Sequence, residues 1–331
     1  MTGETAEIGV IGGSGLYRFL DGAGSVTLDT PYGEPSDAIT VADLEGRRVA
    51  FLPRHGVHHT VPPHRINYRA NLWALHTLGV TRVLGPCAVG SLKAEHGPGT
   101  IVVCDQFVDR TRGRADTYFD GPEVAHLSAA DPYCEELRPL AVQAARDAGM
   151  AARDGGTMVV VNGPRFSTRA ESRWFASAGW AVVGMTQYPE VVLARELGMC
   201  YVNLSLVTDY DSGLEHDASV APVTQEEVFA VFNQNMPRLR EALRRLIAAV
   251  PAQRSCGCAA GWSMFISGLM SGRMRGKTRN SAATSAAAAA STGTKRFNGW
   301  FSGLFTGRCA FVAGFVAIGC CRTSNVRAAS Q

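Results

Sequence analysis

The sequence lacks the patterns that are typical of membrane and secreted proteins. Within its 331 residues the apolar run at 309–321 is only 13 residues long, whereas a membrane-spanning helix needs ~20. The first residues, M-T-G-E-T-A-E, have neither the basic start nor the apolar core of a secretory signal. We therefore expect a cytoplasmic protein without a membrane partner.

Acidic residues are missing from one part of the chain. Residues 261–331 contain nine Lys or Arg and no Asp or Glu, which leaves 23 basic and 29 acidic residues in 1–260. The main body is therefore mildly acidic, and this gives no reason to expect a nucleic-acid partner. We expect one domain at 1–255, followed at 256–331 by a basic, low-complexity tail that is disordered.

The usual zinc and nucleotide motifs are also absent. None of the nine cysteines forms the double C-x-x-C of a zinc site, so we expect buried thiols and no metal. Cys256-Gly-Cys258 is a local pair that is either redox-active or incidental. In the glycine-rich stretch at 8–17, Arg18 stands where a dinucleotide fingerprint needs its third glycine. No Lys-Ser or Lys-Thr pair follows, which excludes a P-loop.

What the stretch at 8–17 does contain is an apolar run that breaks into glycines around Ser14. Glycines let the backbone turn tightly and present its N–H groups to an anion, and the serine hydroxyl adds a donor. This predicts a mononucleotide or phosphate site, with a ligand-free turn as the alternative. The proline-bounded loop at 53–63 carries Arg54 beside His55, which we interpret as a phosphate clamp with a bidentate guanidinium and an imidazole donor. Zinc bound by the histidines of this loop, or a plain polar loop, are the alternatives.

Strand-like runs alternate with helical patterns along residues 1–250, which predicts an α/β fold. We expect one domain with a mixed, mostly parallel central sheet flanked by helices. Strands are expected at 38–44, 47–52, 82–87, 100–108, 157–161, 181–184 and 199–207, and helices at 67–78, 131–149 and 224–250. Capping boxes are expected at Thr168 with Glu171 and at Thr224 with Glu227. The polar segment 110–130 is predicted to be a long excursion, of the kind that often forms a functional flap.

Several polar residues follow predicted strands, where α/β sheets bind their ligands. The small-residue turn at 88–91 follows one strand. Thr186 lies near a predicted helix start, where an anion is favoured. Asp209 and Asp211 follow the most apolar strand, and two carboxylates there are seldom needed for packing. Phe166 either faces a base or packs in the core.

Six motifs occur in one order along the chain: G-G-S-G-L, T-P-Y-G-x-P-S-D, R-H-G-x-x-H-T, N-G-P-R-F-S-T-R-A-E, G-M-T-Q-Y-P-E and T-D-Y-D. Together they resemble the S-methyl-5'-thioadenosine phosphorylase branch of the trimeric purine nucleoside phosphorylases, over residues 7 to about 250. The resemblance implies a nucleoside phosphorylase fold, a homotrimer, and inorganic phosphate as co-substrate with no other cofactor. It implies phosphorolysis of S-methyl-5'-thioadenosine to adenine and 5-methylthioribose 1-phosphate, in methionine and purine salvage.

The resemblance also implies roles by position. The phosphate site matches Ser14, Arg54, His55, the backbone of Ala88, and Thr186. The nucleoside site matches Phe166 and Ser167 at the base, Met185 below the ribose, and His126, which would be lent to a neighbouring subunit. Asp209 and Asp211 match the pair that contacts the purine. We expect Asp209 to protonate N7 and Asp211 to orient the amino group.

Other functions stay open at this stage. Carboxylates accept from an amino group, which favours adenine, but Gln187 and Tyr188 differ from the animal pattern. Phosphorolysis of inosine, guanosine or methylthioinosine is therefore an alternative. A phosphate-independent nucleosidase or a non-catalytic nucleoside-binding protein are others, and the pair of Arg54 and His55 argues against both. The tail is unlike the family's C-terminal end, so the preferred 5'-substituent stays open.

Overall fold

The computed structural model describes residues 4–13, 16, 20, 24–122, 124–212 and 221–260, and the structural statements below concern these residues. Ser14 and the predicted tail from residue 261 onward lie outside them. The described chain continues past the predicted domain boundary at residue 255, and Cys258 packs into the core.

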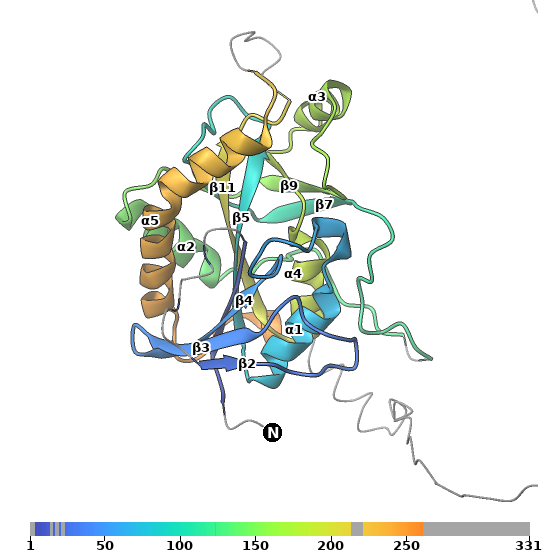
Figure 1. The fold of residues 1–331 in the computed structure, drawn as a ribbon, viewed down its shortest axis with the longest axis vertical. Coiled ribbons are helices and arrows are strands. Elements are labelled where there is room, and N and C mark those ends of the chain that lie inside the picture. Colours follow the sequence, from blue (N-terminus) through green and yellow to red (C-terminus); the bar gives the residue numbers. More distant parts are fainter. Residues whose placement is uncertain are drawn as a thin grey trace, which may run out of the picture. The chain divides into compact units, whose positions relative to one another are not determined.

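Helices and strands alternate along the chain, as the sequence patterns predict (Figure 1). The strands are β1 (Ile8–Gly12), β2 (Gly24–Val26), β3 (Ile39–Leu44), β4 (Arg47–Pro53), β5 (Arg82–Ser91), β6 (Ile101–Val103), β7 (Gln106–Arg110), β8 (Ala152–Asp154), β9 (Thr157–Val161), β10 (Val182–Gly184) and β11 (Cys200–Asp209). The α-helices are α1 (Tyr68–Thr77), α2 (Leu137–Asp147), α3 (Arg169–Ser177), α4 (Gln187–Glu196) and α5 (Gln225–Ala249). Two short 3-10 helices are η1 (Pro63–Arg65) and η2 (Gly257–Ala259).

The described strands form one sheet in the order β2-β3-β4-β1-β5-β10-β9-β7, with β11 also paired to β5 and leading on to β6 and β8. β1 runs parallel to β4 and β5, and β5 runs parallel to β11. β10 pairs antiparallel with β5, as β6 does with β11 and β3 with its neighbours β2 and β4. The predicted mixed, mostly parallel sheet is confirmed.

Helices cover the two faces of the central strands, α2 with α5 on one and α1 with α4 on the other (Figure 1). Successive residues of a strand point to opposite faces, so each strand feeds two cores. Val10 packs in the core that contains Leu243 of α5, while its neighbour Ile11 packs in the core that contains Leu75 of α1. Burial on both faces explains why these strands are continuous apolar runs.

The predicted helix start at Asp131 is wrong, because α2 begins at Leu137. The backbone N–H of Cys134 donates to the Tyr201 carbonyl at 2.8 Å, so this segment is held along β11. The predicted excursion after Arg110 contains no described helix or strand before α2.

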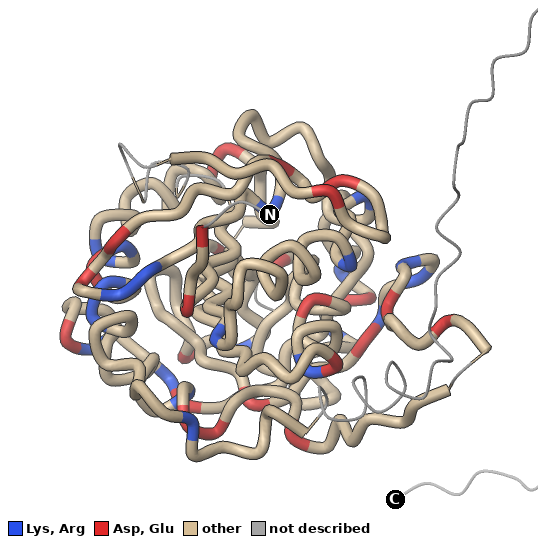
Figure 2. Tube along the Cα trace, turned by 90° about the horizontal axis from the view of Figure 1, so that it is seen from below, with Lys and Arg blue, Asp and Glu red and all other residues tan. Residues whose placement is uncertain are grey.

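Both predicted capping boxes are present, at the start of α3 and at the start of α5. Basic and acidic segments are interspersed around the described chain (Figure 2). None of the helices described is both long and apolar enough to cross a bilayer.

Candidate active site

A cavity of about 270 Å³ lies where the ends of several strands meet. It is lined by Gly13 after β1, by the loop after β4, and by the ends of β5, β10 and β11. β1, β4, β5 and β11 run parallel to one another, so their carboxyl ends lie at the same edge of the sheet and bring segments far apart in sequence together here.

The structure brings most of the predicted site residues to this one cavity. They are Arg54, His55, Ala88, Phe166, Ser167, Met185, Thr186, Asp209 and Asp211. Ser14 lies outside the described residues, although Gly13 beside it lines the cavity. His126 is exposed and does not line the cavity. The individual roles of these residues stay predictions.

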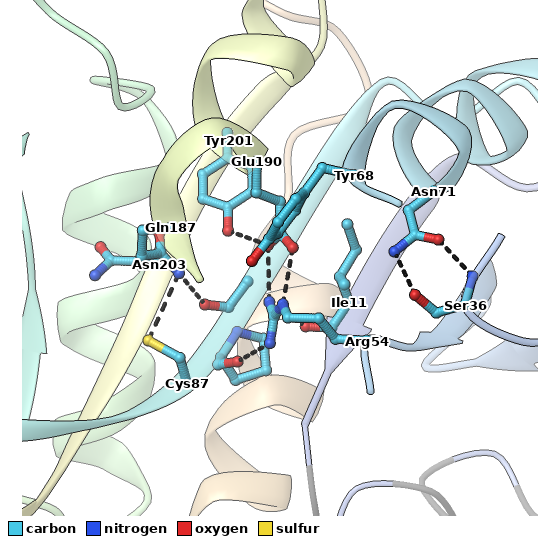
Figure 3. A network of polar contacts seen from close by, with 12 residues as sticks. Ile11, Ser36, Arg54, Tyr68, Asn71, Cys87, Gln187, Glu190, Tyr201 and Asn203 are labelled. Atoms are coloured by element: carbon cyan, nitrogen blue, oxygen red, sulfur yellow. Dashed lines mark hydrogen bonds and ion pairs between the residues drawn. The ribbon is translucent and has the colours of Figure 1, made fainter. Parts of the chain in front are cut away.

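Arg54 directly follows β4, and its guanidinium is buried in a network of polar contacts (Figure 3). Nε and Nη2 donate to the two carboxylate oxygens of Glu190 at 2.8 and 2.7 Å. Nη2 also donates to the Ile11 carbonyl at 2.7 Å, and Nη1 donates to the Pro86 carbonyl at 3.0 Å. The Tyr201 hydroxyl completes the network by donating to Glu190 at 2.6 Å. The network therefore connects β1, β5, β11 and α4 behind the cavity.

These contacts limit what Arg54 can offer to an anion. A guanidinium has five N–H donors, and the contacts above leave one of them, on Nη1. The bidentate fork that the sequence predicted for phosphate is thus used on Glu190 instead. Burial lowers the pKa of Arg54, but the charge and hydrogen bonds of Glu190 outweigh burial and raise it above its usual value. Arg54 therefore lines the cavity as the cationic half of a buried ion pair.

His55 has a defined proton arrangement. Its Nδ1 lies 2.8 Å from the Val61 carbonyl oxygen, which can only accept, so Nδ1 carries the proton. Burial and the adjacent charge of Arg54 lower the pKa of His55 to about 4. In the neutral ring Nε2 is an acceptor, whereas the sequence predicted a donor. Such an atom suits the hydroxyl of a hydrogen phosphate ion.

Asp209 ends β11 with a carboxyl group suited to proton transfer. Burial raises its pKa to about 6, although two hydrogen bonds favour the charged form. These come from the Thr208 hydroxyl and the Asp211 backbone N–H, both at 2.7 Å. A group with a pKa near the working pH can act as a general acid, because its protonated form is populated and gives up the proton readily.

Asp211 faces the cavity from a constrained backbone position. Its φ of 51° lies in the left-handed region, which aspartate tolerates better than most residues. Burial raises the pKa of Asp211, while hydrogen bonds from Ser172 and Ser167 favour its charged form. Gly90 makes room here, since a Cβ on it would lie 2.9 Å from Asp209 Oδ1.

Phe166 is 38% exposed and lines the cavity, so it is not a core residue. Its ring is placed to contact a flat ligand. Met185 lines the same cavity and lies close to Gly163, where an added Cβ would be 2.6 Å from Met185 Sδ. Gly163 has a φ of 65°, so both its conformation and this contact require glycine.

Sequence reasoning missed several residues of the site. Glu190 was not identified as the partner of Arg54, because nothing in the sequence relates positions so far apart. His59, Phe229 and Phe232 also line the cavity, and the His59 and Phe229 rings lie 6.0 Å apart edge to face. The amphipathic pattern of α5 identified apolar residues but not that its first turns reach the cavity.

The sequence predicted separate buried thiols, but four of the cysteines lie close together in the structure. These four, Cys134, Cys200, Cys256 and Cys258, come together despite their scattered positions, and they form the only group of potential metal ligands found in the described chain. The histidines of the loop at 53–63 form no such group there. Cys87 lines the cavity, and its sulfur lies 3.5 Å from both Ser205 Oγ and Gln187 Nε2.

Comparison with known proteins supports the resemblance read from the motifs. The chain is 58% identical over 265 residues to a purine nucleoside phosphorylase of Streptomyces coelicolor, covering 77% of this chain and 94% of that one. It is 56% identical over 251 residues to an S-methyl-5'-thioadenosine phosphorylase of Mycolicibacterium smegmatis, covering 75% and 93%. A methylthioadenosine phosphorylase from Schistosoma mansoni, solved in complex with adenine, matches with a TM-score of 0.72 and 34% identity over 82% of this chain and 99% of that one. Residues 7–248 match the family model described as the phosphorylase superfamily, and the chain belongs to that family.

Proposed function

We propose that the protein is an S-methyl-5'-thioadenosine phosphorylase, which transfers the pentosyl group of that nucleoside from adenine to phosphate. The observation that carries the proposal is one cavity lined both by the buried guanidinium of Arg54 and by the carboxyl groups of Asp209 and Asp211. Several relatives that are at least 50% identical to the chain are named as enzymes of this activity. The Schistosoma relative was solved with adenine bound. The acidic pair of this chain suits the same base, since carboxylates accept from the amino group of adenine.

Phosphate would bind at the end of the cavity formed by Arg54, His55, Ala88 and Thr186. Arg54 supplies one N–H from its ion-paired guanidinium, and the neutral His55 ring accepts a hydrogen bond from the hydroxyl of the hydrogen phosphate dianion. Thr186 is 7% exposed and lines the cavity, and it would offer its hydroxyl and backbone N–H to the anion. Holding the nucleophile beneath the sugar removes much of the entropic cost of the displacement, and its charge stabilises the oxocarbenium-like sugar.

The acidic pair would handle the leaving group. Protonated Asp209 donates to purine N7 as the glycosidic bond breaks, so adenine leaves as a neutral base. Asp211, which lines the same cavity, accepts from the exocyclic amino group. Phe166 would contact the face of the base and Met185 the ribose.

The assembly and setting belong to the same proposal. His126 is exposed outside its own cavity, as expected for a residue that completes a neighbouring site in a homotrimer. The enzyme would work in the cytoplasm in methionine and purine salvage, with inorganic phosphate as its only co-substrate.

Phosphorolysis of 6-oxopurine nucleosides is the second candidate, favoured by the name of the Streptomyces relative. Purified protein is incubated with S-methyl-5'-thioadenosine, adenosine and inosine, each with and without phosphate, and free base is measured. The proposal predicts fastest release of adenine from the methylthio nucleoside, and only with phosphate. Preferred cleavage of inosine supports the second candidate, and release without phosphate contradicts both.

A further inference from the structure

A second concentration of reactive side chains lies away from the cavity. The Sγ atoms of Cys134, Cys200, Cys256 and Cys258, here called the cysteine cluster, all lie within 4.8 Å of one another. None of these residues lines the cavity. Cys200 begins the ten-residue strand β11 and Asp209 ends it, so the cysteine cluster lies about 30 Å from Asp209. The chemistry proposed above does not use it.

Hydrogen bonds hold the cysteine-bearing segments in place independently of the sulfurs. Ser255 donates from its backbone N and its Oγ to Glu136 Oε1, at 3.2 and 2.8 Å. Arg254 donates to the Gly198 carbonyl at 2.6 Å. Each acceptor lies two residues from a member of the cysteine cluster. The segment that follows α5 is therefore fixed against the starts of α2 and β11, which preorganises the four sulfurs.

We propose that the cysteine cluster binds one structural zinc ion. Tetrahedral zinc with Zn–S bonds of about 2.3 Å places its sulfur ligands about 3.8 Å apart. The Sγ atoms of Cys200 and Cys256 lie 3.4 Å apart, and all pairs of the cysteine cluster lie within 4.8 Å. Thiolates are the soft ligands that zinc accepts, and four of them leave no open position for substrate. The ion is therefore structural and not catalytic.

The ligand positions explain what the ion would do. The cysteine cluster joins the segment before α2, the start of β11 and the segment around η2, which are far apart in sequence. Zinc would cross-link them and fix the chain after the long helix α5 to the body of the protein. The spacing of these cysteines in the sequence does not match a zinc motif. Cys134 and Cys200 have no cysteine near them in the sequence, and Cys256 and Cys258 form C-x-C instead of C-x-x-C.

Metal content tests the proposal on the full chain. The protein is purified without a metal-affinity step, dialysed against metal-free buffer and analysed by plasma mass spectrometry. Thiols are counted after denaturation with chelator and without reductant. Cys258→Ser removes one ligand, and Cys104→Ser is the control, because Cys104 is equally buried but lies outside the cysteine cluster. Co²⁺ added to metal-stripped wild-type protein reports thiolate ligation by its charge-transfer absorption, even if the variant does not fold.

The proposal predicts one zinc per chain in the wild type and in Cys104→Ser, at least a fivefold loss in Cys258→Ser, and all nine cysteines of the chain as free thiols. Co²⁺ should give the absorption of tetrahedral thiolate sites. Wild-type protein without zinc overturns the proposal, and so does iron in its place. A thiol count lowered by two for each disulfide overturns it as well.

Discussion

At the residue scale, the account depends on two carboxyl groups placed in opposite environments. Glu190 is fully buried and is held by an ion pair with Arg54 and a hydrogen bond from Tyr201. Asp209 has no cation among its hydrogen-bond partners, and burial raises its pKa to about 6. One carboxylate thus fixes Arg54 at the wall of the cavity, while the other has a raised pKa and lines the same cavity.

Asp209→Asn should lower kcat for S-methyl-5'-thioadenosine by roughly 10²- to 10⁴-fold, because an amide cannot transfer the proton to N7. Steady-state phosphorolysis checks this, with Asp43→Asn as the surface control, since the Asp43 side chain is 74% exposed. Near-normal kcat in Asp209→Asn removes the general-acid role.

The dependence of kcat on pH should show the titration of Asp209. A general acid works only when protonated, so kcat at saturating substrates should fall as pH rises above the Asp209 pKa of about 6. His55, with a pKa of about 4, stays neutral through this range and cannot cause the fall. A methylthioriboside with a p-nitrophenolate leaving group needs no proton, so its profile should lose this decline. An unchanged decline with that substrate contradicts the assignment.

Glu190→Ala should destabilise the protein by about 3–5 kcal/mol, because it leaves the buried guanidinium of Arg54 without its counter-charge. Urea unfolding measures the loss. Glu241→Ala breaks an exposed Arg–Glu pair with Arg245 at 2.8 Å and should cost only about 0.3–0.5 kcal/mol. Equal losses of unfolding free energy in the two variants would show that the buried ion pair stabilises the protein no more than an exposed one.

At the scale of elements, the start of α5 connects helix capping with the wall of the cavity. The Thr224 side chain accepts from the Glu227 backbone N–H, and Glu227 bonds back to the Thr224 backbone N–H. Gln225 and Val228, in the first turns of α5, line the cavity. The cap therefore fixes one wall of the site.

Thr224→Ala should remove about 1 kcal/mol of local helix stability and let the first turn fray. KM for the nucleoside should rise a few-fold with little change in kcat, because Asp209 and Arg54 lie on other elements. Steady-state kinetics measures both constants. Asn67→Ala removes the cap of α1, none of whose residues lines the cavity, and should leave KM unchanged. A fall in kcat alone for Thr224→Ala contradicts this view.

Most strands could be predicted from the sequence, but contacts between distant residues could not. Apolar runs and small-residue turns predicted the sheet and the strand ends where the cavity lies, because burial on both faces and tight turns leave clear patterns. The start of α2 was misplaced, since Asp131-Pro132 is a good local helix start but Cys134 bonds to β11 instead. The Glu190 partner and the cysteine cluster depend on contacts across the fold, which one sequence does not specify.

At the scale of the whole molecule, His126 bears on whether one chain can form a complete active site or needs a neighbouring subunit. It is exposed and lies outside the cavity of its own chain. If it completes a neighbouring site, His126→Ala should lower kcat/KM about tenfold, the loss expected for one contact of about 1.4 kcal/mol.

Mixed assemblies test this directly. Co-expressed His126→Ala and Asp209→Asn chains should regain activity, because some sites then combine an intact Asp209 with an intact His126 from the neighbour. Native mass spectrometry should show trimers of both types. Activity that never exceeds that of the separate variants contradicts the shared site.

The central claim is that phosphate itself attacks the sugar. It is tested most directly by cleaving S-methyl-5'-thioadenosine with ¹⁸O-labelled phosphate in ordinary water and analysing the sugar product by mass spectrometry. The account predicts 5-methylthioribose 1-phosphate that retains all of the phosphate label, including the oxygen bound to C1. Free 5-methylthioribose that carries an oxygen from water would contradict it.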